Sequence, residues 1–137
     1  WRCFSEMVCL DTSFIIDIIR GNKEIRYIEE KIDASSEAIT VAAPVVMELI
    51  KGAIPSEKPE TEKQKVSVFL SSLIILNLNR DSAMLAGEID AKLRKLGDPI
   101  GIEDIMIGAI CLPNNERLLT KNLKHFEKIP GLEIESY

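Results

Sequence analysis

Apolar residues fall into two kinds of grouping along the chain: short continuous runs, and longer stretches in which they recur every three or four positions. Continuous runs are typical of strands buried in a parallel sheet, and periodic stretches of helices with one apolar face. The runs predict strands at 7–10, 38–41, 74–76, 118–120 and 132–134. The periodic stretches predict helices at 12–19, 43–53, 66–73, 81–96 and 102–112, one more around Ile25, Ile28 and Ile32, and a short turn at 122–126. This alternation indicates an α/β fold, a three-layer α/β/α sandwich around a central, mainly parallel sheet of four to five strands.

Capping and turn-forming residues predict where several of these elements end. Thr12 or Ser13 is expected to cap the first helix and Gly21 to end it. The stretch 52–63 carries two prolines among charged residues, which favours an exposed loop. The helix at 81–96 is expected to bury one face, made of Leu85, Ile89, Leu93 and Leu96.

Three acidic residues interrupt apolar segments. Asp11 follows the first strand, Glu48 lies inside the helix at 43–53, and Asp104 lies near the start of the nearly all-apolar helix at 102–112. A carboxylate in an apolar setting is costly to bury unless it is paired or binds a metal. Because three such acids occur in similar settings, we expect them to share one site for a divalent cation. Ligand-binding sites of parallel sheets lie beyond the carboxyl ends of the strands, which is where we expect this site.

Each acid also has an ordinary structural explanation. Asp11 is in position to cap the following helix, Glu48 to lie on a solvent-facing helix surface, and Asp104 to favour the first turn of its helix through the dipole. The shared site therefore depends on all three acids having this setting together, and no single one establishes it.

Size and composition fit one folded domain. The chain has 137 residues, 46% of them hydrophobic and 28% charged, and we expect a single domain at 7–137. Residues 1–6 do not resemble the start of a domain and are expected to be an upstream extension or a cloning remnant. No apolar run is long enough to span a bilayer. Cys9 and Cys111 lie in apolar segments and are expected to be reduced, which favours a cytoplasmic location.

The formal net charge of −5 argues against broad, nonspecific binding to nucleic acid, which needs a basic surface. It is compatible with a nuclease whose carboxylates are neutralised by bound cations, and with a basic protein partner.

The order and spacing of five segments resemble the PIN-domain family, specifically the VapC-type toxin ribonucleases of toxin–antitoxin pairs. The resemblance runs from Met7 onward and covers the rest of the chain. Its segments are Leu10-Asp11-Thr12-Ser13-Phe14-Ile15-Ile16-Asp17, Pro44-Val45-Val46-Met47-Glu48-Leu49, Ile100-Gly101-Ile102-Glu103-Asp104-Ile105-Met106-Ile107-Gly108-Ala109, Leu119-Thr120-Lys121-Asn122 and His125-Phe126-Glu127-Lys128-Ile129-Pro130-Gly131-Leu132. No segment is specific by itself, so the signal lies in the whole set.

The resemblance implies a metal-dependent endoribonuclease that hydrolyses RNA phosphodiester bonds. Asp11, Glu48 and Asp104 would be its catalytic residues and its Mg²⁺ or Mn²⁺ ligands. The supporting residues would be Ser13, Thr120 and Asn122. RNA contacts are expected from the basic residues that flank these segments: Lys51, Arg117, Lys121, Lys124 and His125.

One departure concerns the fourth acid that family members often carry near the fourth strand. This chain has Asn122 and His125 in that region, which puts a second metal ion in doubt. The resemblance also implies a cognate antitoxin and a homodimer, and the lack of a long apolar run leads us to expect no membrane association. Two alternatives stay open: a non-catalytic PIN-like binding module, and another Mg²⁺-dependent phosphoryl-transfer protein such as a phosphatase or a receiver domain.

Overall fold

The computed structural model describes residues 7–35 and 37–137. The expected extension at 1–6, which includes Cys3, lies outside the described residues. The strands are β1 (Met7–Leu10), β2 (Ala38–Ala42), β3 (Ile74–Leu76), β4 (Arg117–Thr120) and β5 (Glu133–Ser136). The helices are α1 (Thr12–Ile19), α2 (Arg26–Ala34), α3 (Ala43–Ala53), α4 (Pro59–Leu70), α5 (Arg80–Lys95), α6 (Ile102–Cys111) and α7 (Leu123–Phe126).

The five strands form one sheet in the order β3-β2-β1-β4-β5, and every neighbouring pair is parallel. The expected α/β class is therefore confirmed, with five strands and no antiparallel pair in residues 7–35 and 37–137. Strands β2 and β3 follow one another on one side of β1, whereas β4 and β5 lie on its other side. The strand order therefore reverses between β1 and β4, and this pair marks the topological switch point of the sheet.

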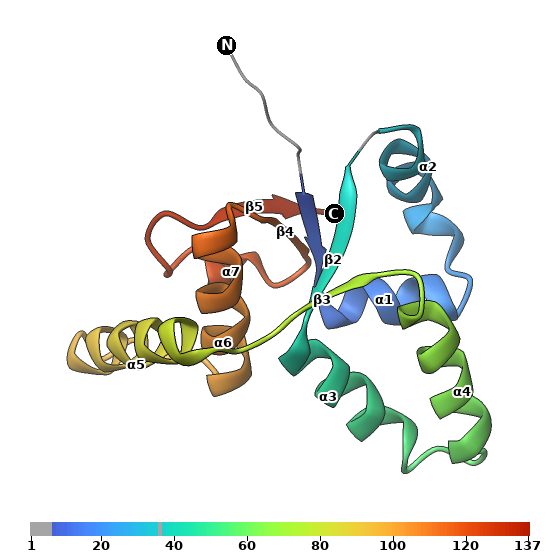
Figure 1. The fold of residues 1–137 in the computed structure, drawn as a ribbon, viewed down its shortest axis with the longest axis horizontal. Coiled ribbons are helices and arrows are strands. Elements are labelled where there is room, and N and C mark those ends of the chain that lie inside the picture. The colour runs from blue at the N-terminus through green and yellow to red at the C-terminus, as the bar shows by residue number, and fades with distance from the viewer. Residues whose placement is uncertain (1–6, 36) are drawn as a thin grey trace.

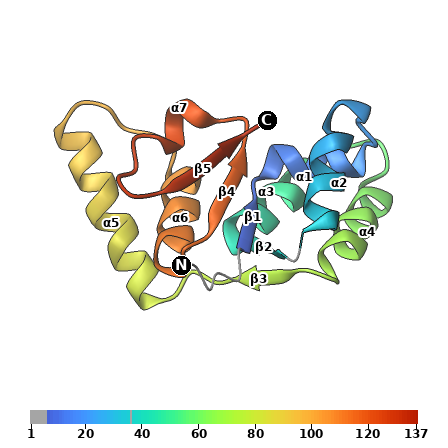
Figure 2. The ribbon, with the colours of Figure 1, turned by 90° about the horizontal axis from the view of Figure 1, so that it is seen from above.

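Helices cover the sheet from two sides (Figures 1 and 2). The helices α1, α2 and α4 lie on one side of the sheet and α5, α6 and α7 on the other, and α3 contacts both α1 and α6. The same division follows from right-handed crossovers, because the chain changes direction across the sheet after β3.

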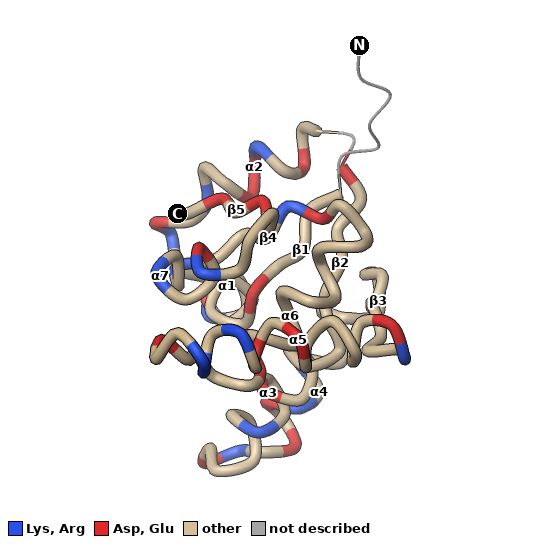
Figure 3. The backbone as a smooth tube through the Cα atoms, turned by 90° about the vertical axis from the view of Figure 1, so that its left-hand side faces the viewer, with Lys and Arg blue, Asp and Glu red and all other residues tan. Residues whose placement is uncertain are grey.

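The core lies between the sheet and these helices. Its fully buried side chains come from the sheet and from helices on both of its sides, and include Leu10, Phe14, Ile105 and Leu118. Helix α6 is buried nearly all round, as its apolar sequence predicts. Charged residues of both signs are spread over the helices and loops (Figure 3).

The main differences from the sequence prediction concern α4, α5 and β5. Helix α4 begins at Pro59, inside the stretch expected to be a loop, because a proline suits the first helical turn and the glutamates behind it favour the positive end of the helix dipole. Leu96 is 77% exposed, and Ser82 and Ala86 take its expected place beside Ile89 and Leu93 on the buried face of α5. Strand β5 lies slightly later than predicted, where it pairs with β4.

Among the described residues, no helix has the length and apolar character needed to cross a membrane.

Candidate active site

Asp11 lies at the switch point of the sheet. Its backbone N–H donates to the carbonyl of Leu119 at 3.0 Å, which joins the ends of β1 and β4. Its side chain is 7% exposed, and both carboxylate oxygens accept hydrogen bonds: Oδ1 from the Thr12 N–H at 2.8 Å and Oδ2 from the Thr120 hydroxyl at 2.6 Å. Asp11 is therefore the N-cap of α1, which corrects the expectation that Thr12 or Ser13 caps this helix. The carboxylate is held in one orientation as a result.

Burial raises the pKa of Asp11 above its usual value, and the negative charge of Asp104 raises it further. The hydrogen bonds from Thr120 and Thr12 act in the opposite direction because they stabilise the charged form. Asp11 and Asp104 are 93 positions apart in sequence. The fold brings them near enough to each other for their charges to interact.

Glu48 projects from α3 toward the same region. Its Oε2 accepts from the Thr12 hydroxyl at 3.1 Å, while its Oε1 is buried and has no hydrogen-bond partner among the described residues. Burial raises the pKa of Glu48, and the charges of Asp11, Asp104 and Glu103 add to the rise. Glu48 is thus not the solvent-facing residue of the ordinary explanation.

Asp104 is the third carboxylate, contributed by the first turn of α6. Its Oδ2 lies 2.8 Å from Nδ1 of His125 and accepts from the Asn122 amide at 3.3 Å. The imidazole donates to Asp104 when Nδ1 carries the proton. The backbone N–H of Asn122 donates to the Thr120 hydroxyl at 2.9 Å, and that hydroxyl donates to Asp11.

A continuous set of hydrogen bonds therefore joins the three acids. Thr12 connects Glu48 to the start of α1, where Asp11 caps the helix, and Thr120 and Asn122 connect Asp11 to Asp104. Within residues 7–35 and 37–137, however, no three carboxylate, thiol or imidazole groups already form a cluster able to hold a metal ion. Each carboxylate is instead turned toward a protein donor, so the convergence of all three on one ion stays a prediction.

An open pocket of about 360 Å³ lies beside Asp11. It is lined by Asp11, Thr12, Ser13, Ile16, Lys121 and Asn122. Two of the expected supporting residues, Ser13 and Asn122, and one expected RNA contact, Lys121, thus share a pocket with Asp11. Thr120 is fully buried and supports the site through its hydroxyl.

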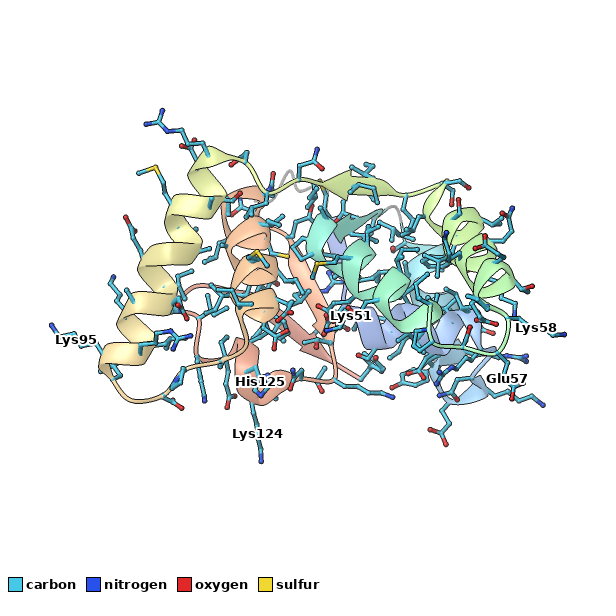
Figure 4. All side chains as sticks on the ribbon, turned by 90° about the horizontal axis from the view of Figure 1, so that it is seen from below. Lys51, Glu57, Lys58, Lys95, Lys124 and His125 are labelled. Carbon is cyan, nitrogen blue, oxygen red and sulfur yellow. The ribbon has the colours of Figure 1, made fainter. Side chains whose placement is uncertain are left out.

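The other basic residues lie in different surroundings. Lys51 is exposed on α3, and Lys124 projects outward beside His125 on α7 (Figure 4). Arg117 opens β4 at the opposite end of the sheet and is paired with Glu37 at 2.9 Å and Glu135 at 2.6 Å. The structure therefore removes Arg117 from the candidate RNA contacts.

Sequence reasoning missed two residues at this site. Thr12 was considered only as a helix cap, yet it links Asp11 to Glu48 through its N–H and its hydroxyl. Its position directly after an acidic N-cap was the available signal. Tyr137 also reaches the pocket rim, where its hydroxyl donates to Oγ of Ser13 at 3.1 Å. Nothing in the sequence pattern pointed to Tyr137.

Comparison with known proteins gives concordant results. The PIN domain model matches residues 8–132. The tRNA(fMet)-specific endonuclease VapC of Salmonella typhimurium is 34% identical over 128 residues, which is 93% of this chain and 96% of that protein. Ribonuclease VapC2 of Rickettsia felis is 30% identical over the same shares of the two chains.

Solved structures agree with this result. A chain of VapBC2 from Rickettsia felis, bound to a DNA fragment from its promoter, superposes with a TM-score of 0.85 at 28% identity, over 96% of this chain and 98% of that one. A chain of DNA-bound VapBC from Salmonella typhimurium gives a TM-score of 0.83 at 32% identity, over 96% and 97% of the two chains. The chain belongs to the PIN-domain family, as the order of its acidic segments predicted. Within that family it is a VapC-type protein.

Proposed function

We propose that this protein is a Mg²⁺- or Mn²⁺-dependent endoribonuclease whose active site is formed by Asp11, Glu48 and Asp104. The observation that carries this proposal is the hydrogen-bonded connection of the three acids at the switch point of the sheet. The names of the relatives, which are ribonucleases and an endonuclease, supply the substrate class.

The residues present fit a hard divalent cation. Carboxylate oxygens are the ligands that Mg²⁺ and Mn²⁺ prefer. The Oε1 atom of Glu48 is buried without a partner, which is costly unless a ligand satisfies it. Burial is the main cause that raises the pKa values of Asp11 and Glu48, and the negative charge of Asp104 adds to both rises, so a cation among these acids would stabilise their charged forms.

A bound divalent ion would polarise the scissile phosphate and supply a nucleophilic water near neutral pH. The chain's own residues prepare that site. Thr120 and the Thr12 N–H fix the orientation of Asp11, and His125 and Asn122 hold Asp104. These donors are in place before substrate arrives, so the side chains of Asp11 and Asp104 are already ordered when the ion and RNA bind.

We also propose a cytoplasmic toxin that is inhibited by a cognate antitoxin. The solved relatives are VapBC complexes, which gives the class of partner. The physics favours a basic segment: an Arg side chain pairs bidentately with carboxylates, and the net charge of −5 speeds the approach of a positively charged partner.

The test is cleavage of unfractionated tRNA and of messenger RNA by the purified protein, with Mn²⁺ and with chelator. We expect cleavage only with the ion, and none with Asp11→Asn. Asp33→Asn makes the same chemical change at an exposed position on α2 and should cleave as the unaltered protein does. Cleavage that persists in chelator, or that survives Asp11→Asn, would overturn the proposal. Metal-independent RNA binding without any cleavage would instead indicate a non-catalytic binding module.

A further inference from the structure

The pocket beside Asp11 has one acidic wall and one basic wall. Asp11 lies on one side, and Lys121 is the one Lys or Arg among the described residues that line the pocket. The hydroxyl of Ser13 lines it as well. A backbone phosphate that bridges to a metal ion at Asp11 would meet both of these groups.

The strand register explains how Lys121 comes to this place. β4 and β5 are parallel, and Thr120 is paired with Ser136 at the carboxyl ends of both strands. The residues that follow, Lys121 and Tyr137, therefore leave the sheet next to each other. The Lys121 ammonium lies 5.2 Å from the centroid of the Tyr137 ring, within the range of a cation–π contact.

Tyr137 is itself held on two sides. Its ring makes an edge-to-face contact with the buried Phe14, with centroids 4.9 Å apart and the planes at 72°. Its hydroxyl donates to Ser13, which leaves the hydroxyl proton of Ser13 free to be donated into the pocket. One aromatic side chain thus touches both polar groups on the basic side of the pocket.

A second anchor for Lys121 comes from α1. Its Nζ lies 2.9 Å from Oδ2 of Asp17, and Oδ1 of Asp17 also accepts from the Asn22 amide at 3.3 Å. The Asp17 side chain is 17% exposed and that of Lys121 is 51% exposed. An ammonium group has three N–H donors, so one bond to Asp17 leaves donors directed at solvent. Lys121 is therefore oriented and still accessible.

We propose that Lys121 and Ser13 form a subsite for an RNA backbone phosphate beside the metal site, and that Tyr137 and Asp17 are positioning residues for it. This inference rests on the proposed ribonuclease function and identifies where that substrate is held. Its distinctive consequence concerns Asp17. Simple charge repulsion predicts that removing this carboxylate improves RNA binding, whereas loss of a positioning residue predicts that binding becomes weaker.

The experiment measures kcat and KM for tRNA cleavage with Mn²⁺ at several salt concentrations. We expect Lys121→Ala to raise KM by about tenfold with little change in kcat, and to reduce the slope of log affinity against log salt by about one. Lys121→Arg should recover most of the loss. Lys95→Ala is the matched control, because Lys95 is an exposed lysine at the far end of α5 (Figure 4).

The positioning residues have their own variants. Asp17→Asn and Tyr137→Leu should each raise KM several-fold, and Tyr137→Phe, which keeps the ring, should have the smaller effect. Thermal unfolding of each variant separates loss of fold from loss of binding. The subsite is refuted if Lys121→Ala behaves as Lys95→Ala does, or if Asp17→Asn lowers KM.

Failure of the proposed ribonuclease function gives a different result. In that case the unaltered protein does not cleave RNA under any metal condition. Equilibrium binding of labelled tRNA to the same variants then decides the subsite by itself: equal affinities for Lys121→Ala and Lys95→Ala overturn it, and a selective loss with Lys121→Ala supports it.

Discussion

Individual threonines hold the acidic residues of this protein in place. Thr120 donates to Asp11 from the end of β4, and Thr12 donates to Glu48 from the start of α1. Hydroxyl donors stabilise a carboxylate without neutralising it, so the site keeps its negative charge while its side chains stay ordered. The negative charges that remain repel one another, which lowers the stability of the fold. The same negative charge attracts a cation.

Asp104→Asn tests this balance. We expect cleavage of RNA to fall below detection, because a neutral amide is a weak ligand for Mg²⁺ or Mn²⁺. In chelator the melting temperature should stay the same or rise, since the Asp104 charge acts against Asp11 and Glu48. Calorimetric melting beside the unaltered protein measures this. A fall of many degrees would make Asp104 a structural residue and contradict the assignment.

Glu116 is a buried acid outside the site. It is 1% exposed, its Oε2 accepts from the Thr40 hydroxyl at 3.0 Å, and its Oε1 has no hydrogen-bond partner in the part of the chain that the structure describes. Burial raises the pKa of Glu116, and the Thr40 hydrogen bond only partly opposes this. A carboxyl group whose pKa is raised on folding stabilises the fold most below its unfolded pKa, and that contribution is lost as pH rises through the folded pKa.

Comparison with Glu116→Gln isolates this effect, because every other titrating group is common to both proteins. The free energy of unfolding of the unaltered protein, minus that of the variant, should fall as pH rises from about 4.5 toward neutrality. Urea unfolding at a series of pH values supplies both quantities. A difference that is flat with pH would show that Glu116 titrates alike in the folded and unfolded chains.

Helices α5 and α6 each contain one glycine, and the space around these two glycines differs. A Cβ on Gly108 of α6 would collide with the side chain of buried Ile129, whereas a Cβ on Gly87 of α5 would meet no atom within 4 Å. Helix propensity favours alanine over glycine at both positions by about 1 kcal/mol. Alanine substitution at the two glycines therefore distinguishes the effect of helix propensity on stability from the effect of packing.

Gly87→Ala should raise the free energy of unfolding by about 0.5–1 kcal/mol. Gly108→Ala should lower it by about 1–2 kcal/mol, since Ile129 must leave a well-packed rotamer. Denaturant unfolding of the two variants makes the comparison, and each serves as the control for the other. Equal stabilisation by both would mean that Ile129 moves aside without cost.

The sequence predicts the elements best where apolar residues dictate them. The four residues of β1 and the whole of α3 agree with prediction at both ends, because a continuous run or a clear period leaves no alternative. The start of α4 was missed because charged residues around Pro59 are as typical of a loop as of an exposed helix. For the candidate site, the acids could be found from their apolar settings. The position of Thr12 after an acidic residue gave a signal for its role, but the role of Tyr137 could not be found because it depends on strand register.

At the scale of the whole molecule, we predict a homodimer. The apolar side chains next to Glu48 on α3 belong in part to the core, because Val45 is fully buried and Leu49 is 4% exposed. Large apolar side chains are exposed elsewhere, notably Val68 on α4 and Met84 on α5. Light scattering at micromolar concentration should give about twice the chain mass of 15.3 kDa. A mass of one chain would refute the dimer.

The position of β4 has a consequence for the protein during its own synthesis. Asp11 and Glu48 leave the ribosome early, but β4 follows about 70 residues after Glu48 and must insert beside β1. Until then Asp11 lacks both the Leu119 carbonyl and the Thr120 hydroxyl, and Asp104 lacks Asn122 and His125. We therefore expect the emerging chain to carry its acids without an assembled site until β4 and α7 have been synthesised.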